Sequence, residues 1–119
     1  MDNKILIGKF GQKLAAEFLQ KRKYSILQEN FYARFGEIDL VAQKDGQIIF
    51  IEIKTRLSCE FGLPEDSLTK AKSEKIREAA LEYLDKKQIN NENYRFDLIA
   101  VQIDKIRKRA QIRHYKNVI

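Results

Sequence analysis

Residues 36–56, with the sequence GEIDLVAQKDGQIIFIEIKTR, have the pattern of a β-hairpin. Two apolar runs flank the dipeptide Asp45-Gly46, which is a common turn between antiparallel strands. The second run, residues 48–53, is rich in isoleucine and is therefore typical of a buried strand. We expect the rest of the sheet to assemble around this hairpin.

Three charged side chains interrupt the apolar runs: Asp39 in the first, and Glu52 and Lys54 in the second. Strand side chains alternate between faces, so Glu52 and Lys54 share a face, and pairing around the turn brings Asp39 near Glu52. Two buried carboxylates repel each other unless a cation lies between them. The pattern therefore indicates a Mg²⁺ (or Mn²⁺) site at Asp39 and Glu52, with Lys54 binding a phosphate oxygen or orienting the attacking water. The alternative is a structural Glu52–Lys54 ion pair beside a solvated Asp39.

The same residues resemble a known group of proteins. Asp39 followed by Glu52-Ile53-Lys54 fits the D…(D/E)-x-K core of the restriction-endonuclease-like nuclease superfamily. The words GEIDLV (residues 36–41) and IEIKTR (residues 51–56) resemble the YraN family of small bacterial proteins, which is similar in fold to archaeal Holliday-junction resolvases. The resemblance covers nearly the whole chain and includes residues 8–15, Asn30, residues 61–64 (FGLP), Lys72 and residues 95–97 (RFD).

This resemblance implies a Mg²⁺-dependent DNA endonuclease that acts on branched or structured DNA. Asp39, Glu52 and Lys54 would be the catalytic residues, Asp39 and Glu52 the metal ligands, and Glu37 an acid next to them. Gln12 departs from the family pattern, which usually has Glu there, beside the metal site. Glutamine keeps the shape of the side chain and can hydrogen-bond water, but it is a poorer cation ligand and cannot act as a base.

Gln12 therefore leaves a second hypothesis open, in which the protein keeps the nuclease fold and binds nucleic acid without cutting it. A third hypothesis is an adaptor that binds another protein. A homodimer is expected if the protein cuts two strands symmetrically.

The net charge of +6 and the pI near 9.4 suit a polyanionic partner such as DNA. The candidate nucleic-acid contacts are Arg34, Arg56, Lys70, Lys72 and Lys75. The alternative for these residues is a solvated charged surface. His114 is expected to be a surface residue or a phosphate contact rather than a metal ligand, and Asp97 to support the sheet edge or pair with Arg95.

The length of 119 residues predicts one domain, residues 1–119. The single cysteine, Cys59, excludes an internal disulfide and agrees with a reducing compartment. Neither a signal peptide nor an apolar stretch of membrane-spanning length is present, so a cytoplasmic location without membrane association is expected.

Helical spacing of apolar residues predicts a first helix that ends near residues 21–23, and a second helix over residues 67–87 capped by Asp66 or Ser67. Further strands are predicted over residues 25–30, 94–101 and 110–115. The order is α-β-β-β-α-β-β, an α/β fold in which two helices flank a mixed central sheet. This agrees with the restriction-endonuclease-like fold that the resemblance implies.

Overall fold

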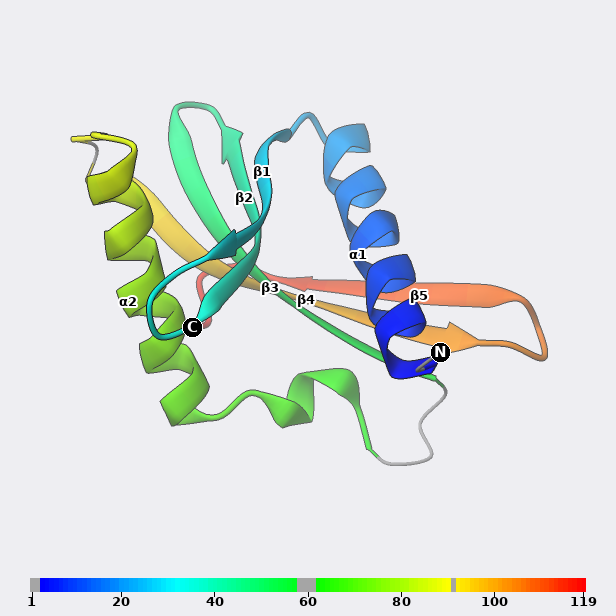
Figure 1. Ribbon diagram of the computed structural model, residues 1–119. Coiled ribbons are helices and arrows are strands. Elements are labelled where there is room, and N and C mark those ends of the chain that lie inside the picture. Colours follow the sequence, from blue (N-terminus) through cyan, green and yellow to red (C-terminus); the bar gives the residue numbers. More distant parts are fainter. Residues whose placement is uncertain (1–2, 58–61, 91) are drawn as a thin grey trace.

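The computed structural model of the protein describes residues 3–57, 62–90 and 92–119. In chain order they form α1 (Asn3–Lys21), β1 (Ser25–Tyr32), β2 (Glu37–Lys44), β3 (Gln47–Leu57), the 3₁₀-helix η1 (Pro64–Ser67), α2 (Lys70–Lys86), β4 (Tyr94–Asp104) and β5 (Arg109–Tyr115). The predicted order α-β-β-β-α-β-β is confirmed (Figure 1), and the architecture is compatible with a restriction-endonuclease-like fold. Cys59 and Phe61, which the sequence analysis named, lie outside the described residues.

The five strands form one mixed sheet in the order β1-β2-β3-β4-β5. β3 and β4 run parallel, with α2 in the connection between them, and the other neighbours are antiparallel. In the predicted hairpin, Lys44 pairs with Gln47 across Asp45 and Gly46. The φ angles of these two turn residues, +51° and +79°, are positive as a type I′ turn requires. The turn dipeptide therefore sets the register of β2 against β3.

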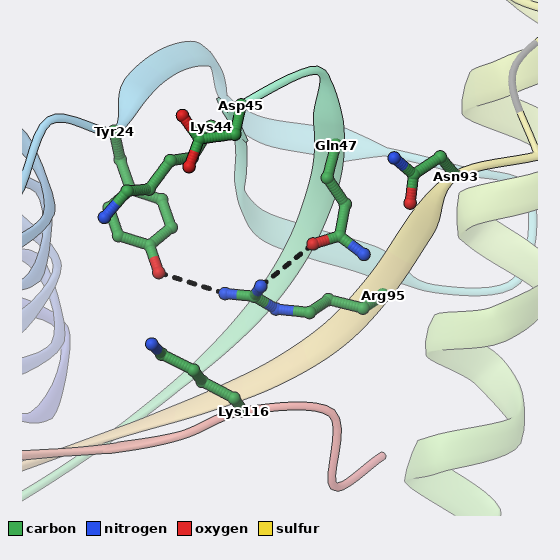
Figure 2. A pocket seen from close by; sticks show the side chains of 7 residues that line it. All are labelled: Tyr24, Lys44, Asp45, Gln47, Asn93, Arg95 and Lys116. Carbon is green, nitrogen blue, oxygen red and sulfur yellow. Dashed lines mark hydrogen bonds between the residues drawn. The ribbon is translucent and has the colours of Figure 1, made fainter.

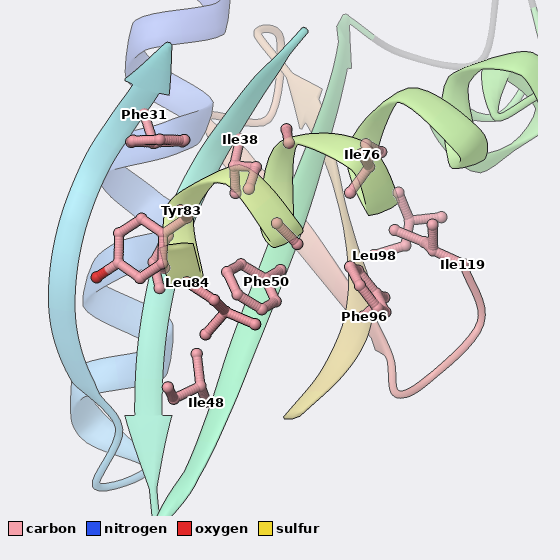
Figure 3. Packing of buried hydrophobic residues seen from close by; sticks show 13 residues of the cluster. Phe31, Ile38, Ile48, Phe50, Ile76, Tyr83, Leu84, Phe96, Leu98 and Ile119 are labelled. Atoms are coloured by element: carbon pink, nitrogen blue, oxygen red, sulfur yellow. The ribbon is translucent and has the colours of Figure 1, made fainter. Parts of the chain in front are cut away.

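The two helices cover opposite faces of the sheet (Figure 1), and each face has its own apolar cluster. On the α2 face, the ring of Phe50 stacks on Phe96 with 5.5 Å between centroids, and Tyr83 packs edge-on against Phe31 (Figure 3). On the α1 face, Ala15 and Leu19 are fully buried. Among the described residues, neither helix has the length and apolar composition needed to cross a membrane.

α1 packs closely against β3 at Gly11. A Cβ atom added at Gly11 would lie 2.0 Å from Oγ1 and 2.9 Å from Cβ of Thr55. Gly11 therefore allows α1 to lie directly against the Thr55 side chain of β3. Gly8, in contrast, has no heavy atom within 4 Å of such a position.

α2 begins later than predicted. Residues 64–67 form the separate helix η1, and the N-cap of α2 is Thr69, whose hydroxyl accepts a hydrogen bond from the Lys72 amide. The prediction that Asp66 or Ser67 caps this helix is therefore wrong. Asp66 instead accepts the Leu63 amide and closes the η1 turn, in which Pro64 occupies the first position.

A buried polar cluster joins β4, β5 and α1. Asp97 is fully buried and accepts hydrogen bonds from the guanidinium of Arg95, while Nε2 of His114 lies 2.7 Å from its Oδ2. Burial alone would raise the pKa of Asp97, but the bonds from His114 and Arg95 outweigh it and lower the pKa. The expectation that His114 is a surface or phosphate contact is wrong, because its ring packs between Asp97 and the aromatic rings of Phe18 and Tyr24.

We predict that Gly11→Ala lowers the free energy of unfolding by about 1–3 kcal/mol, because the added methyl group forces α1 away from Thr55. The matched control is Gly8→Ala in the same helix, which should raise it by about 0.5–1 kcal/mol through helix propensity alone. Urea unfolding monitored by circular dichroism measures both. Equal effects of the two substitutions would contradict the close packing.

Candidate metal centre

β2 and β3 separate near Asp39. Their ladder runs from the Lys44–Gln47 pair to the Leu40–Ile51 pair, and beyond it Oδ2 of Asp39 accepts the Ile53 amide at 2.8 Å. The alternation of β2 also breaks here, because its residues 38 and 40 pack in clusters on opposite faces of the sheet. The Asp39 side chain thus takes the place of a main-chain partner for Ile53, and β2 and β3 diverge beyond the Leu40–Ile51 pair. We call this point of divergence, with Asp39 and Glu52, the fork.

Asp39 and Glu52 meet at this fork, as the pairing of the hairpin predicts. Burial, followed by the nearby charge of Glu52, raises the pKa of Asp39 from 3.8 to about 7. The hydrogen bond from the Ile53 amide acts in the opposite direction and is outweighed. Burial also raises the pKa of Glu52, although Lys54 opposes the shift. The fork therefore holds two carboxyl groups whose negative charge is poorly compensated.

Lys54 lies beside the acids, with its Nζ 3.1 Å from Oε1 of Glu52. Both side chains are only about 15% exposed (16% and 15%), so this ion pair, which the sequence analysis gave as the structural alternative, is present and largely buried. The Lys54 charge lowers the pKa of Lys72, which reaches the centre from α2. Two lysines from different elements therefore flank Glu52.

A groove of about 860 Å³ lies between α1 and the fork. Asp39, Lys54 and Arg56 line it from the strands, together with Glu37, and Gln12 lines it from α1. Four of the predicted site residues, Asp39, Lys54, Glu37 and Gln12, therefore line one open space, whereas the second predicted metal ligand, Glu52, is not among the lining residues. Gln12 and Asp39 thus line the same groove, one from α1 and the other from β2.

The helix also supplies two cations to this groove, Lys4 and Lys9, that the sequence analysis did not name. The signal for Lys9 was available, because it lies three residues before Gln12 and such residues share a helix face. The same spacing places Gly8, four residues before Gln12, on the groove wall.

The remaining predicted nucleic-acid contacts lie apart from the groove. Arg34 is in the loop between β1 and β2, where its amide donates to Glu82 on α2. Lys75 packs its main chain against the same loop, at Gly36. Lys70 is exposed at the first residue of α2. These three cations thus follow α2 and the adjoining loop, whereas Arg56 and Lys72 adjoin the acids.

The donor set at the fork fits a hard divalent cation. Asp39 and Glu52 supply carboxylate oxygens, which Mg²⁺ and Mn²⁺ prefer. Burial, followed by repulsion from Glu52, raises the pKa of Asp39, and a bound cation would offset both effects. Within the described ranges, however, no three Asp, Glu, His or Cys side chains come together as a metal-binding group. Glutamine at position 12 agrees with this, because a glutamate there would supply a third acid.

A second pocket, of about 270 Å³, lies at the start of β3 and is unlike the groove (Figure 2). Arg95 crosses it and donates hydrogen bonds to Oε1 of Gln47 at 2.9 Å and to the hydroxyl of Tyr24 at 3.0 Å. The same guanidinium binds the buried Asp97. This pocket therefore belongs to the structural cluster of Asp97, and the predicted pairing of Arg95 with Asp97 is confirmed.

We predict that the metal-free protein loses stability between pH 4 and pH 8. The folded protein holds the Asp39 proton up to about pH 7, whereas an Asp of ordinary pKa 3.8 releases it earlier, so the folded state binds more protons in this window. Asp39→Asn removes this effect. The free energy of unfolding of the variant minus that of the wild type should therefore rise by roughly 2–4 kcal/mol between pH 4 and pH 8. Urea unfolding in EDTA measures the difference, and a pH-independent difference would contradict the raised pKa.

Comparison with known proteins agrees with the motifs. The family model described as "Uncharacterised protein family UPF0102" matches residues 11–101. A UPF0102 protein of Syntrophomonas wolfei is 40% identical over 98 residues, which cover 82% of this chain and 85% of the relative. UPF0102 protein FP2501 of Flavobacterium psychrophilum is 42% identical over 93% of this chain and 91% of its own length. A UPF0102 protein of Clostridium perfringens is 48% identical over 80% and 78%. The chain therefore belongs to the UPF0102 family, which is the YraN family that its motifs resemble.

Proposed function

We propose that the protein is a divalent-metal-dependent DNA endonuclease that acts on branched or structured DNA. The observation that carries this proposal is the meeting of Asp39 and Glu52 at the fork of β2 and β3, beside Lys54. Asp39 and Lys54 also line a groove that holds further cations. Paired carboxylates with raised pKa values, a lysine and an adjoining basic groove are the parts that metal-assisted phosphodiester hydrolysis needs.

Asp39 and Glu52 would hold Mg²⁺ or Mn²⁺, and the main-chain carbonyl of Ile53 is a candidate further ligand. When bound, the cation supplies polarisation of the phosphate and lowers the pKa of a water molecule. Ligating carboxylates must be ionised, so metal binding is coupled to loss of the proton that Asp39 keeps up to about pH 7.

Lys54 has two roles in this proposal. In the metal-free protein it compensates the buried charge of Glu52 in part. When a bound cation neutralises Glu52, the Lys54 ammonium would be able to donate to a phosphate oxygen or orient the attacking water. Lys72, which adjoins Lys54 and is exposed, can contact a neighbouring phosphate. Gln12 can orient water in the groove through its amide, but it cannot remove a proton.

The DNA backbone would be held by Arg56 and Lys72 beside the centre, and by Arg34, Lys70 and Lys75 along α2. Such phosphate contacts give binding that weakens with salt and depends little on sequence. Preference for branched DNA follows from the similarity to Holliday-junction resolvases, and fold similarity is weaker support than the site itself. Symmetric cutting of two strands would require a homodimer.

A second candidate function is nucleic-acid binding without cleavage. It is favoured by Gln12 and by the finding that, among the described residues, no three Asp, Glu, His or Cys side chains come together in a group that could hold a metal ion. The raised pKa of Asp39 argues against it, because a purely structural carboxyl group gains nothing from repulsion by Glu52. Cleavage in the presence of Mn²⁺ separates the two candidates.

We predict that Asp39→Asn and Glu52→Gln each lower Mn²⁺-dependent cleavage of branched, flapped or single-stranded DNA by roughly a hundredfold or more, because loss of a metal ligand removes several kcal/mol of transition-state stabilisation. Gel assays with Mn²⁺, Mg²⁺ or EDTA measure the rates. Glu17→Gln, which changes an exposed acid of α1, is the matched control and should cleave like the wild type. Equal rates for all four proteins, or no cleavage by the wild type, would refute the endonuclease.

We further predict that Gln12→Glu tightens Mn²⁺ binding about tenfold, because it adds a third carboxylate to the groove that holds Asp39. Electron paramagnetic resonance of free Mn²⁺ measures the affinity. Gln20→Glu adds the same charge to an exposed position of α1 and should leave the affinity unchanged. If both variants bind alike, position 12 does not adjoin the metal.

A further inference from the structure

The tip of the β4–β5 hairpin is the most exposed apolar and basic point of the described chain. β4 and β5 pair as far as Asp104 and Arg109, and residues 105–108 form the turn. Ile106 in this turn is 95% exposed, the highest value among the large exposed hydrophobic residues. Figure 1 shows the hairpin projecting beyond the rest of the sheet. The tip thus presents an isoleucine where turns usually carry glycine, asparagine or aspartate.

The exposed side chains at the tip, Ile106 and the neighbouring cations, contribute little to the stability of the turn. Oδ1 of Asp104 accepts the amides of Ile106 and Arg107 at 3.0 and 3.1 Å. Lys108 adopts a positive φ of 52° and completes the turn. Arg107 contacts Asp104 only at 3.8 Å in an exposed pair, which contributes little to stability. The fold therefore does not require an isoleucine or cations at this tip.

The charges of the tip fit a polyanion. Four cations, Lys105, Arg107, Lys108 and Arg109, surround Ile106, and the one acid, Asp104, is engaged with the turn amides. Cations alone would suit any anionic surface. An isoleucine among them matches duplex DNA, in which apolar wedges enter between base steps from the minor groove while basic residues bind the phosphates on either side.

The tip also lies at a suitable distance from the fork. In the parallel β3–β4 ladder, Lys54 pairs with Ala100, and Asp104 follows four residues later, roughly 13 Å further along the strand. The turn adds a few ångströms, and half a helical turn of duplex DNA spans roughly 17 Å. Arg56, which pairs with Gln102, lies between the centre and the tip. One duplex can therefore reach both places.

We propose that the β4–β5 tip is a second DNA contact, in which its cations bind backbone phosphates and Ile106 wedges into a base step of the minor groove. This inference rests on the proposed function, because it takes DNA as the partner of the fork. The tip would hold and distort the duplex on one side of the reacting phosphate, and this would favour DNA that is already bent or branched.

The cations are tested by Lys105→Gln/Lys108→Gln in fluorescence anisotropy with labelled duplex and branched DNA. Affinity should fall about tenfold, and the slope of log K against log salt concentration should become shallower by about 2, because two phosphate contacts are lost. The matched control, Lys86→Gln/Lys87→Gln, removes two exposed cations at the end of α2, away from the tip (Figure 1). The same slope change in both double variants would overturn the proposal.

The wedge is tested separately with duplexes that carry 2-aminopurine at successive positions, because the fluorescence of this base rises when it is unstacked. Wild-type protein should raise the fluorescence severalfold above that of the free duplex, and Ile106→Ala should abolish the rise without changing the salt slope. Leu81→Ala, which truncates another exposed residue (59%), should behave like the wild type. No rise with the wild type would overturn the wedge.

If the protein cleaves DNA but the tip variants match their controls, this inference fails alone. If the wild type binds no DNA, the proposed function fails too.

Discussion

The hydrogen bond from the Ile53 amide to the Asp39 carboxylate is the contact on which the centre depends. A buried amide must have a partner, and at this point β2 supplies a side chain instead of a main-chain carbonyl. The strands can therefore separate without leaving the Ile53 amide unpaired. The separation places Asp39 near Glu52 and leaves the Asp39 carboxyl group at the edge of a groove. This bond thus accounts for the fork and for the meeting of the acids, whereas burial and the charge of Glu52 raise the pKa of Asp39.

The elements around the fork are held by contacts that do not involve it. Gly11 lets α1 approach Thr55, so the helix lies close enough to β3 to form one wall of the groove. Asp97 ties β4 to β5 through His114. Functional groups on rigid, separately supported elements keep their geometry when substrate binds. This arrangement explains why one sheet can carry both a pair of repelling carboxyl groups and the projecting β4–β5 hairpin.

Much of the fold could be predicted because its signals are local. Asp45-Gly46 and the isoleucine run define the hairpin within a few residues, and its register brings Asp39 to Glu52. The first residue of α2 could not be predicted from local signals. Hydrogen bonds within residues 63–67 form the separate helix η1 there instead of the first turn of α2. The burial of His114 depends on aromatic rings that are distant in sequence, which no periodicity reveals. The break in the alternation of β2 was likewise hidden, because it lies where the pairing with β3 ends and the Asp39 side chain binds the Ile53 amide.

The most direct test of the metal centre is calorimetric titration of Mn²⁺ into the protein at pH 7, in two buffers with different enthalpies of ionisation. If Asp39 is a ligand with a pKa of about 7, binding should release roughly half a proton, and the heats in the two buffers should differ accordingly. Asp39→Asn should bind weakly and show no buffer dependence. Absence of specific Mn²⁺ binding by the wild type, or the same proton release from both proteins, would contradict a metal centre at the fork.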